Sequence, residues 1–140
     1  MKLFQLIYGS RPFGFDSSIL SGILLESREN NKRDGVTGAL ICRGDLYLQL
    51  LEGTEAAIKN TYERILKDDR HLEIKKLVWR RVPVRLFPEW AMRDDPAKSW
   101  LWSKSQIENG ALENASEEEL VSVFFKLASG LKRNDQTKIN

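Results

Sequence analysis

The stretch that most constrains the fold runs from Gly35 to Gly53, where two apolar segments flank the turn Arg43-Gly44-Asp45. The turn sets the register of a hairpin between residues 36–42 and 46–51. Alternation then places residues 47, 49 and 51 on one face and residues 46, 48 and 50 on the other. Both faces are largely apolar, so the hairpin is predicted to lie inside a sheet that is covered on both sides.

Gln49 is the anomaly in this hairpin, because an amide brings two donors and two acceptors into an apolar strand. Burying such a group is costly unless it is hydrogen-bonded. Two interpretations remain open from the pattern itself: Gln49 pairs with nearby groups in the core, or it lines a ligand site.

The segments around the hairpin predict the element order βαββαββ. Strands are expected at residues 2–8, 74–82 and 87–93; helices are expected from Asp16 to about Asn30 and, capped by Thr54, over residues 55–67. A helix at either end of the hairpin, with strands outside both, predicts an α+β sandwich of the ferredoxin-like kind. Both helices are expected on one face of the sheet.

The second face needs a cover, and the C-terminal region can supply it. Ser116-x-x-Glu119 is a capping box that opens a predicted amphipathic helix over residues 116–131, with Leu120, Phe124 and Leu127 facing inward. We therefore expect residues 1–95 to form the main domain and residues 96–140 to form a helical cap within the same compact unit.

Composition excludes several classes of protein. With 140 residues the chain suits one domain, and no apolar run approaches the roughly 18 residues of a membrane span. The N-terminus lacks a cleavage pattern, so a cytoplasmic location is expected. The net charge of +2 is too small to argue for nucleic acid, and the basic residues between Lys75 and Arg85 are expected to guard a strand edge. Cys42 is predicted to be a small buried hydrophobic residue.

The usual catalytic sets are absent from the sequence. One histidine and one cysteine make no metal cluster, and the glycines follow neither the phosphate-binding loop nor the dinucleotide fingerprint. His71 is expected to make a favourable charge interaction with the end of the second helix. The chain is accordingly predicted not to be an enzyme.

A different group of side chains converges in the predicted sandwich, at the groove between the two helices. Ile23, Leu24 and Ile65 would form apolar walls. Amides and an aromatic edge suit a flat heteroaromatic ligand with donor and acceptor groups. The members of the set are Tyr8, Ser27, Asn30, Asn31, Gln49, Arg64, Asp68, Trp90 and Met92.

These residues, in this order, resemble the BLUF family of flavin-based blue-light sensors. The resemblance covers about residues 1–95 and rests on Tyr8, Asn30-Asn31 before Gly35-Val36-Thr37-Gly38, Leu48-Gln49-Leu50-Leu51-Glu52-Gly53, Arg64-Ile65 followed by Asp68, and Trp90-Ala91-Met92. Ala91 departs from the serine of relatives, which weakens any role for that side chain and leaves Trp90 and Met92 intact.

The resemblance implies a bound FAD, with FMN as the alternative, whose ring lies between the two helices. It assigns Asn31 to the pyrimidine edge, Asn30 to a position near it, Ser27 to the slot, Ile65 to the ring, and Arg64 and Asp68 to the phosphate tail or the rim. Tyr8 would donate an electron and a proton to the excited flavin. Gln49 would link Tyr8 to the N5/O4 edge of the ring.

An amide suits such a switch, because its rotation or tautomerisation exchanges donor for acceptor at fixed shape. A hydrogen bond is worth about 1 kcal/mol net and an unsatisfied buried group costs about 1–3 kcal/mol. That is enough to bias a strand carrying Trp90 and Met92, which would pass the change to the C-terminal helices.

The leading hypothesis is a photoreceptor that signals to a separate downstream protein, plausibly a cyclic-nucleotide enzyme, and that forms a homo-oligomer. No nucleic-acid or membrane partner is expected. Two alternatives stay open: a flavin-dependent oxidoreductase, and a flavin-free ferredoxin-like regulatory or acyl-phosphate-hydrolysing domain in which Arg11 binds an anion. Tyr8 is the only acid/base group beside the proposed ring, which disfavours the first, and the second leaves Gln49 unexplained.

Overall fold

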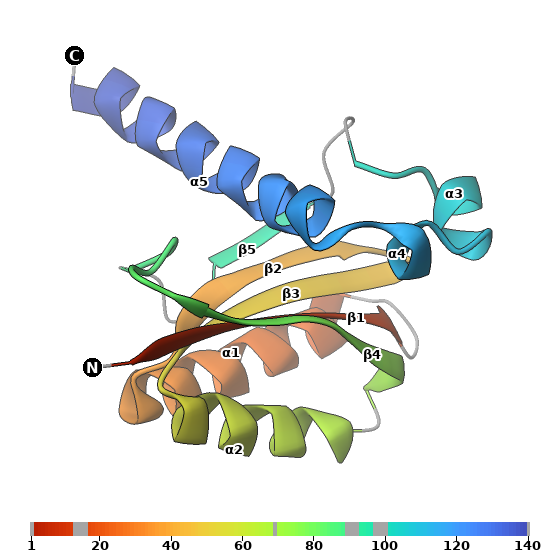
Figure 1. Ribbon diagram of the computed structural model, residues 1–140, viewed down its shortest axis with the longest axis horizontal. Coiled ribbons are helices and arrows are strands. Elements are labelled where there is room, and N and C mark those ends of the chain that lie inside the picture. Colours follow the sequence, from red (N-terminus) through yellow and green to blue (C-terminus); the bar gives the residue numbers. More distant parts are fainter. Residues whose placement is uncertain (1, 13–16, 69, 89–92, 97–100, 140) are drawn as a thin grey trace.

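The computed structural model describes residues 2–12, 17–68, 70–88, 93–96 and 101–139. Two layers of helices enclose one sheet (Figure 1). The elements in chain order are β1 (Leu3–Pro12), α1 (Ser17–Asp34), β2 (Thr37–Arg43), β3 (Leu46–Gly53), α2 (Glu55–Leu66), β4 (His71–Val82), β5 (Arg93–Pro96), α3 (Lys104–Glu108), α4 (Ala111–Asn114) and α5 (Glu117–Ile139).

The sheet has the strand order β4-β1-β3-β2-β5. Strands β4, β1, β3 and β2 pair antiparallel, and β5 adds to β2 in parallel. Helices α1 and α2 cover one face of the sheet and α5 crosses the other (Figure 1). The predicted ferredoxin-like α+β architecture is therefore confirmed, with helices on both faces.

The alternation predicted for the central hairpin holds. Tyr47 and Leu51 belong to the core cluster beneath α1 and α2, whereas Leu46, Leu48 and Leu50 belong to the cluster packed against α5. Strand β3 is buried along its whole length. Gly38 permits the close approach of β2 and β3, because a Cβ at that position would overlap the carbonyl oxygen of Leu50.

The helix starts follow the predicted caps. Thr54 Oγ1 accepts a hydrogen bond from the Ala57 N–H at 3.3 Å, and Ser116 and Glu119 form the expected capping box. Two helices are longer than predicted. Helix α1 continues past Asn30 and ends before Gly35, whose φ of 71° turns the chain into β2. Helix α5 runs to Ile139. No proline follows its start, and the single glycine, Gly130, is not enough to end it.

The prediction of a last strand over residues 87–93 is wrong in its position. Phe87 and Pro88 lie outside any strand, and β5 begins at Arg93. The reason is that the backbone N–H groups of Leu86 and Phe87 are bonded to the carboxylate of Glu52, so they are not available to a strand ladder. Trp90 and Met92 lie outside the described residues.

The basic residues Lys75, Lys76, Arg80 and Arg81 lie on β4, which is an edge strand as predicted. Of these, Arg80 is half-buried and the other three are exposed, while Arg85 follows the strand. Cys42 is buried, also as predicted. Of the helices that are described, none combines the length and the apolar character needed to cross a bilayer.

Candidate functional site

Tyr8 and Gln49 lie opposite each other on β1 and β3, on the face that α1 and α2 cover. Tyr8 is fully buried, and its phenolic oxygen has no hydrogen-bond partner in the described part of the chain. Burial, helped by the negative charge of Asp68 and by Tyr62 and Tyr47, raises the pKa of Tyr8 well above its usual value. Tyr8 therefore keeps its proton at neutral pH, and its buried hydroxyl group still has a hydrogen bond to make.

A cleft of about 100 Å³ opens between α1 and α2, above Gln49. It brings together seven of the predicted site residues: Ser27, Asn30, Asn31, Gln49, Arg64, Ile65 and Asp68. Ile23, one of the predicted apolar walls, lines it too, while Leu24 is buried in the core cluster behind. The set was predicted to converge from three strands and two helices. The helix residues and Gln49 do converge, Tyr8 is not among the residues that line the cleft, and Met92 lies outside the described residues.

The cleft is small beside the roughly 300–1,000 Å³ of typical ligand pockets. Ser27, Arg64 and Ile65 along its walls are only partly buried. A ring can therefore enter if these side chains move aside.

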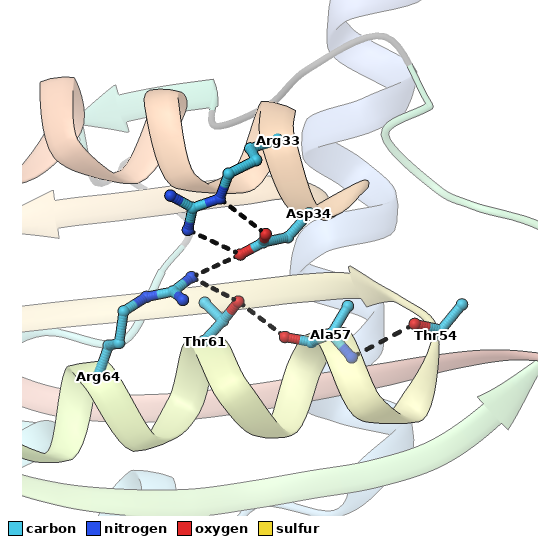
Figure 2. A network of polar contacts seen from close by, with 6 residues as sticks. All are labelled: Arg33, Asp34, Thr54, Ala57, Thr61 and Arg64. Carbon is cyan, nitrogen blue, oxygen red and sulfur yellow. Dashed lines mark hydrogen bonds and ion pairs between the residues drawn. The ribbon is translucent and has the colours of Figure 1, made fainter.

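One end of the cleft is bridged by an ion pair between the helices. Arg64 on α2 donates from Nη2 to Asp34 Oδ2 at 3.0 Å and to Thr61 Oγ1 at 3.3 Å (Figure 2). Arg33 also bonds Asp34, and the two guanidinium groups lower the pKa of that carboxyl. Arg64 is thus a half-exposed cation at the rim.

The cleft has a second bridge, made by Arg70 in the turn just before β4. Its Nη2 lies 2.7 Å from Asp68 Oδ2 and 2.8 Å from Glu26 Oε2 on α1. Burial raises the pKa of Asp68, but the hydrogen bonds from Arg70 outweigh it and lower the pKa overall. Sequence reasoning missed Arg70; its position two residues after Asp68, at the end of the predicted helix, was the available signal.

His71 corrects a prediction. It is buried in β4 and lines the cleft, and burial lowers its pKa, so the ring is neutral and makes no charge interaction with the helix end. His71 Nδ1 and Ser10 Oγ share a hydrogen bond of 3.0 Å. The ring stands 5.2 Å from Tyr47 and 6.2 Å from Tyr8, centroid to centroid.

Comparison with known proteins decides the family. The sequence profile of BLUF, "Sensors of blue-light using FAD", matches residues 3–93. The chain belongs to the BLUF family. The segment is 32% identical over 74 residues to the photoactivated adenylate cyclase subunit beta of Euglena gracilis and 37% identical over 70 residues to the blue light- and temperature-regulated antirepressor BluF of Escherichia coli K12.

These alignments cover 52% and 50% of this chain but only 9% and 17% of the two relatives. Among solved structures, the dark-state structure of the BLUF protein BlrB superimposes with a TM-score of 0.77 at 28% identity, over 92% of this chain and 97% of that one. The likeness therefore extends beyond the sheet and its two helices, into the C-terminal region.

The residues present fit the flavin that BLUF domains bind. The buried Tyr8 oxygen lacks a partner within the described residues, and the amides of Asn31 and Gln49 line the cleft beside the apolar side chains of Ile23 and Ile65. A heteroaromatic ring with polar atoms on one edge matches that mixture of walls and amides. Across the described residues, no cluster of side chains is suited to hold a metal ion.

Proposed function

We propose that this chain is a blue-light photoreceptor that holds FAD non-covalently in the cleft between α1 and α2 and reports illumination to a separate protein. The observation that carries the proposal is the Tyr8 hydroxyl, fully buried and without a partner in the described structure, directly across from Gln49. A buried hydroxyl of this kind costs about 1–3 kcal/mol unless a ligand or a neighbouring amide satisfies it.

Each of the cleft residues would contact a different part of the flavin. Asn31, which is 1% exposed, would bond the pyrimidine edge, with Asn30 and Ser27 beside it. Ile65 would lie against the ring. Arg64, with Asp68 nearby, would face the phosphate tail at the rim, which favours FAD or FMN over riboflavin.

Non-covalent binding is proposed because Cys42 is not among the residues that line the cleft, and the Nδ1 atom of His71 is already hydrogen-bonded to Ser10.

The photochemistry uses the pair Tyr8 and Gln49. The bound flavin would supply blue-light absorption and would accept one electron and one proton when excited. Tyr8 would donate both, and the Gln49 amide would relay the proton, because its oxygen accepts a hydrogen bond and its NH₂ group donates one. Return of the electron and the proton to Tyr8 would leave Gln49 rotated or tautomerised, and in the dark the amide would go back to its first arrangement.

Reconstitution tests this proposal. The purified protein should be yellow or bind FAD when it is supplied, and blue light should shift the flavin absorption to longer wavelength reversibly. A colourless protein that fails to take up flavin contradicts the proposal. Light-independent consumption of a reductant would favour the oxidoreductase instead.

We further propose that residues 1–95 form the flavin domain, that residues 96–140 cap it and carry the output, and that the chain itself catalyses no reaction on a substrate. The proposed partner is a cytoplasmic signalling protein, namely a cyclic-nucleotide enzyme, because one relative is a photoactivated adenylate cyclase subunit.

A homo-oligomer is expected through α5, where Phe125 is 61% exposed. Phe125→Ser should then lower the mass measured by sedimentation while the spectral shift persists; an unchanged mass would place the contact elsewhere.

A further inference from the structure

Glu52 is a fully buried carboxylate on β3, three residues beyond Gln49. Its oxygens accept hydrogen bonds from the backbone N–H of Leu86, at 2.7 and 2.9 Å, and from that of Phe87, at 2.9 Å. Gln5 Nε2 donates to it at 3.3 Å. A buried carboxylate is rare unless it has a specific partner, and here the partner is the backbone of the segment between β4 and β5.

The carboxylate belongs to a polar row that crosses four strands. Arg80 on β4 pairs with Gln5 on β1, Gln5 with Glu52 on β3, and Glu52 with Thr37 on β2. Arg80 Nε donates to Gln5 Oε1 at 2.9 Å. Arg85 closes the row, since its Nη1 donates to Thr37 Oγ1 at 2.9 Å and to the Glu52 carbonyl at 3.1 Å. The segment after β4 is thus fastened to β3 at both backbone and side chain.

The fastened segment reaches α5. Phe87 is 1% exposed, and its ring meets that of Phe124 edge-on, with centroids 6.5 Å apart and planes at 88°. Phe124 is itself fully buried in α5. A continuous set of packed and hydrogen-bonded groups therefore runs from β3 through Glu52 and Phe87 to Phe124.

We propose that Glu52 is a positioning residue that couples a change at Gln49 to α5, by holding the backbone of residues 86 and 87 to strand β3. The inference rests on the proposed function. Gln49 faces the flavin cleft and Glu52 faces the α5 side, so a small shift of β3 moves both ends of the coupling together. The short bonds from Leu86 and Phe87 transmit that shift because Glu52 and Phe87 are fully buried, so that breaking a bond would leave a buried polar group unsatisfied.

Glu52→Gln tests the coupling. A carboxylate accepts at both oxygens, whereas an amide has one acceptor and would direct an NH₂ group at a backbone N–H donor. Two quantities would be measured in the flavin-loaded full chain: the light-induced spectral shift and the light-induced change in amide hydrogen exchange over residues 117–130 of α5.

We expect Glu52→Gln to keep the spectral shift and to reduce the exchange change in α5 at least about fivefold. Two controls are matched to it. Glu55→Gln makes the same chemical change at an exposed position on α2, and Ile58→Val lowers stability by removing a buried methyl group on the other side of the sheet. Both variants should retain the full response of α5. That result would show that neither the change of a carboxylate to an amide nor a loss of stability is enough to reduce the response.

Two outcomes would overturn the inference. Either Glu52→Gln retains the full response in α5, or it loses the spectral shift, which would put Glu52 in the photochemistry rather than in the coupling. A wild-type chain with no spectral shift would instead refute the proposed function, so the two failures are distinguishable.

If Glu52→Gln does not fold, Phe124→Leu provides the second test. It keeps an apolar side chain and removes the ring contact with Phe87, and it should reduce the α5 response to a similar degree. A full response in Phe124→Leu would also overturn the inference.

Discussion

Two buried polar pairs join β1 to β3, and they differ in how they are satisfied. Gln5 and Glu52 lie on the α5 side of the sheet, and their hydrogen bonds reach Arg80, Leu86 and Phe87. Tyr8 and Gln49 lie three rungs away on the opposite side, and there the phenolic oxygen finds no partner among the described residues. A polar group bonded from within the chain stabilises the fold, whereas a buried hydroxyl without such a bond still needs a partner, which a ligand can supply.

The largest effect should come from changes at Tyr8 and Gln49. Tyr8→Phe removes the oxidisable hydroxyl and keeps the ring, so flavin binding should persist and the light-induced spectral shift should vanish. Gln49→Leu should behave in the same way, because it removes the amide that changes its hydrogen bonds. Difference spectra before and after illumination measure both, and a wild-type shift in either variant would contradict the relay.

The next effect concerns the wall of the cleft. Asn31→Ala should weaken flavin retention by about fivefold to tenfold, the loss expected for one neutral hydrogen bond of about 1 kcal/mol. Equilibrium dialysis of the reconstituted protein measures it. Asn60→Ala, on an exposed position of α2, is the control and should bind flavin as the wild type does.

A change at Gln5, which bonds Glu52, should have the opposite effect: it should lower stability and leave the light response unchanged. Gln5→Leu removes the bonds to Glu52 and Arg80 and should lower the free energy of unfolding by about 1–3 kcal/mol, while the spectral shift remains. Thermal denaturation gives the first quantity and absorption spectra the second. If Gln5→Leu lost the spectral shift and kept its stability, the contrast between the Gln5–Glu52 pair and the Tyr8–Gln49 pair would be contradicted.

His71 makes the free energy of unfolding depend on pH. Burial lowers its pKa in the folded chain, so between that pKa and about 6.5 the unfolded chain binds more protons. Stability should therefore be greatest above pH 6.5 and fall as the pH drops below it. His71 is the only histidine, so His71→Gln should flatten the curve between about pH 7 and 5.5. A slope that survives in the variant would assign it to other groups.

The smallest effect is expected at the rim. Arg64→Gln breaks the half-exposed pair with Asp34 and should change the free energy of unfolding by at most about 1 kcal/mol in the apoprotein. Its effect on flavin release should be greater at low salt, because screening weakens a rim cation that faces phosphates. Stopped-flow dilution at two salt concentrations tests this, and Lys59→Gln is a control away from the cleft.

The sequence predicted the features that depend on local patterns. Alternation gave the two faces of β3, and the caps at Thr54 and Ser116 gave the helix starts, because each rests on residues within a few positions of one another. The convergence of the cleft residues followed from the fold class. The roles assigned to these residues stay predictions, and so do those of Trp90 and Met92.

The features that were missed depend on distant contacts. Phe87 was predicted to begin a strand, but Glu52, 35 positions away, takes its N–H. His71 was predicted to make a charge interaction with a helix end, but the strand it begins packs it beside Tyr47 and Ser10. Local sequence patterns do not indicate which distant buried acceptor will bond the backbone of a segment.

The shortness of β5 limits how the molecule can change shape. Its four residues cover β2 only from Ala39 to Cys42, at the edge of the sheet. If β5 detached completely, an apolar strand would present unpaired N–H and C=O groups to solvent, which is the condition for edge-to-edge aggregation. Turnover between light and dark states over many cycles is therefore compatible only with small displacements of this strand, and repeated illumination should leave the protein as dispersed as prolonged darkness does.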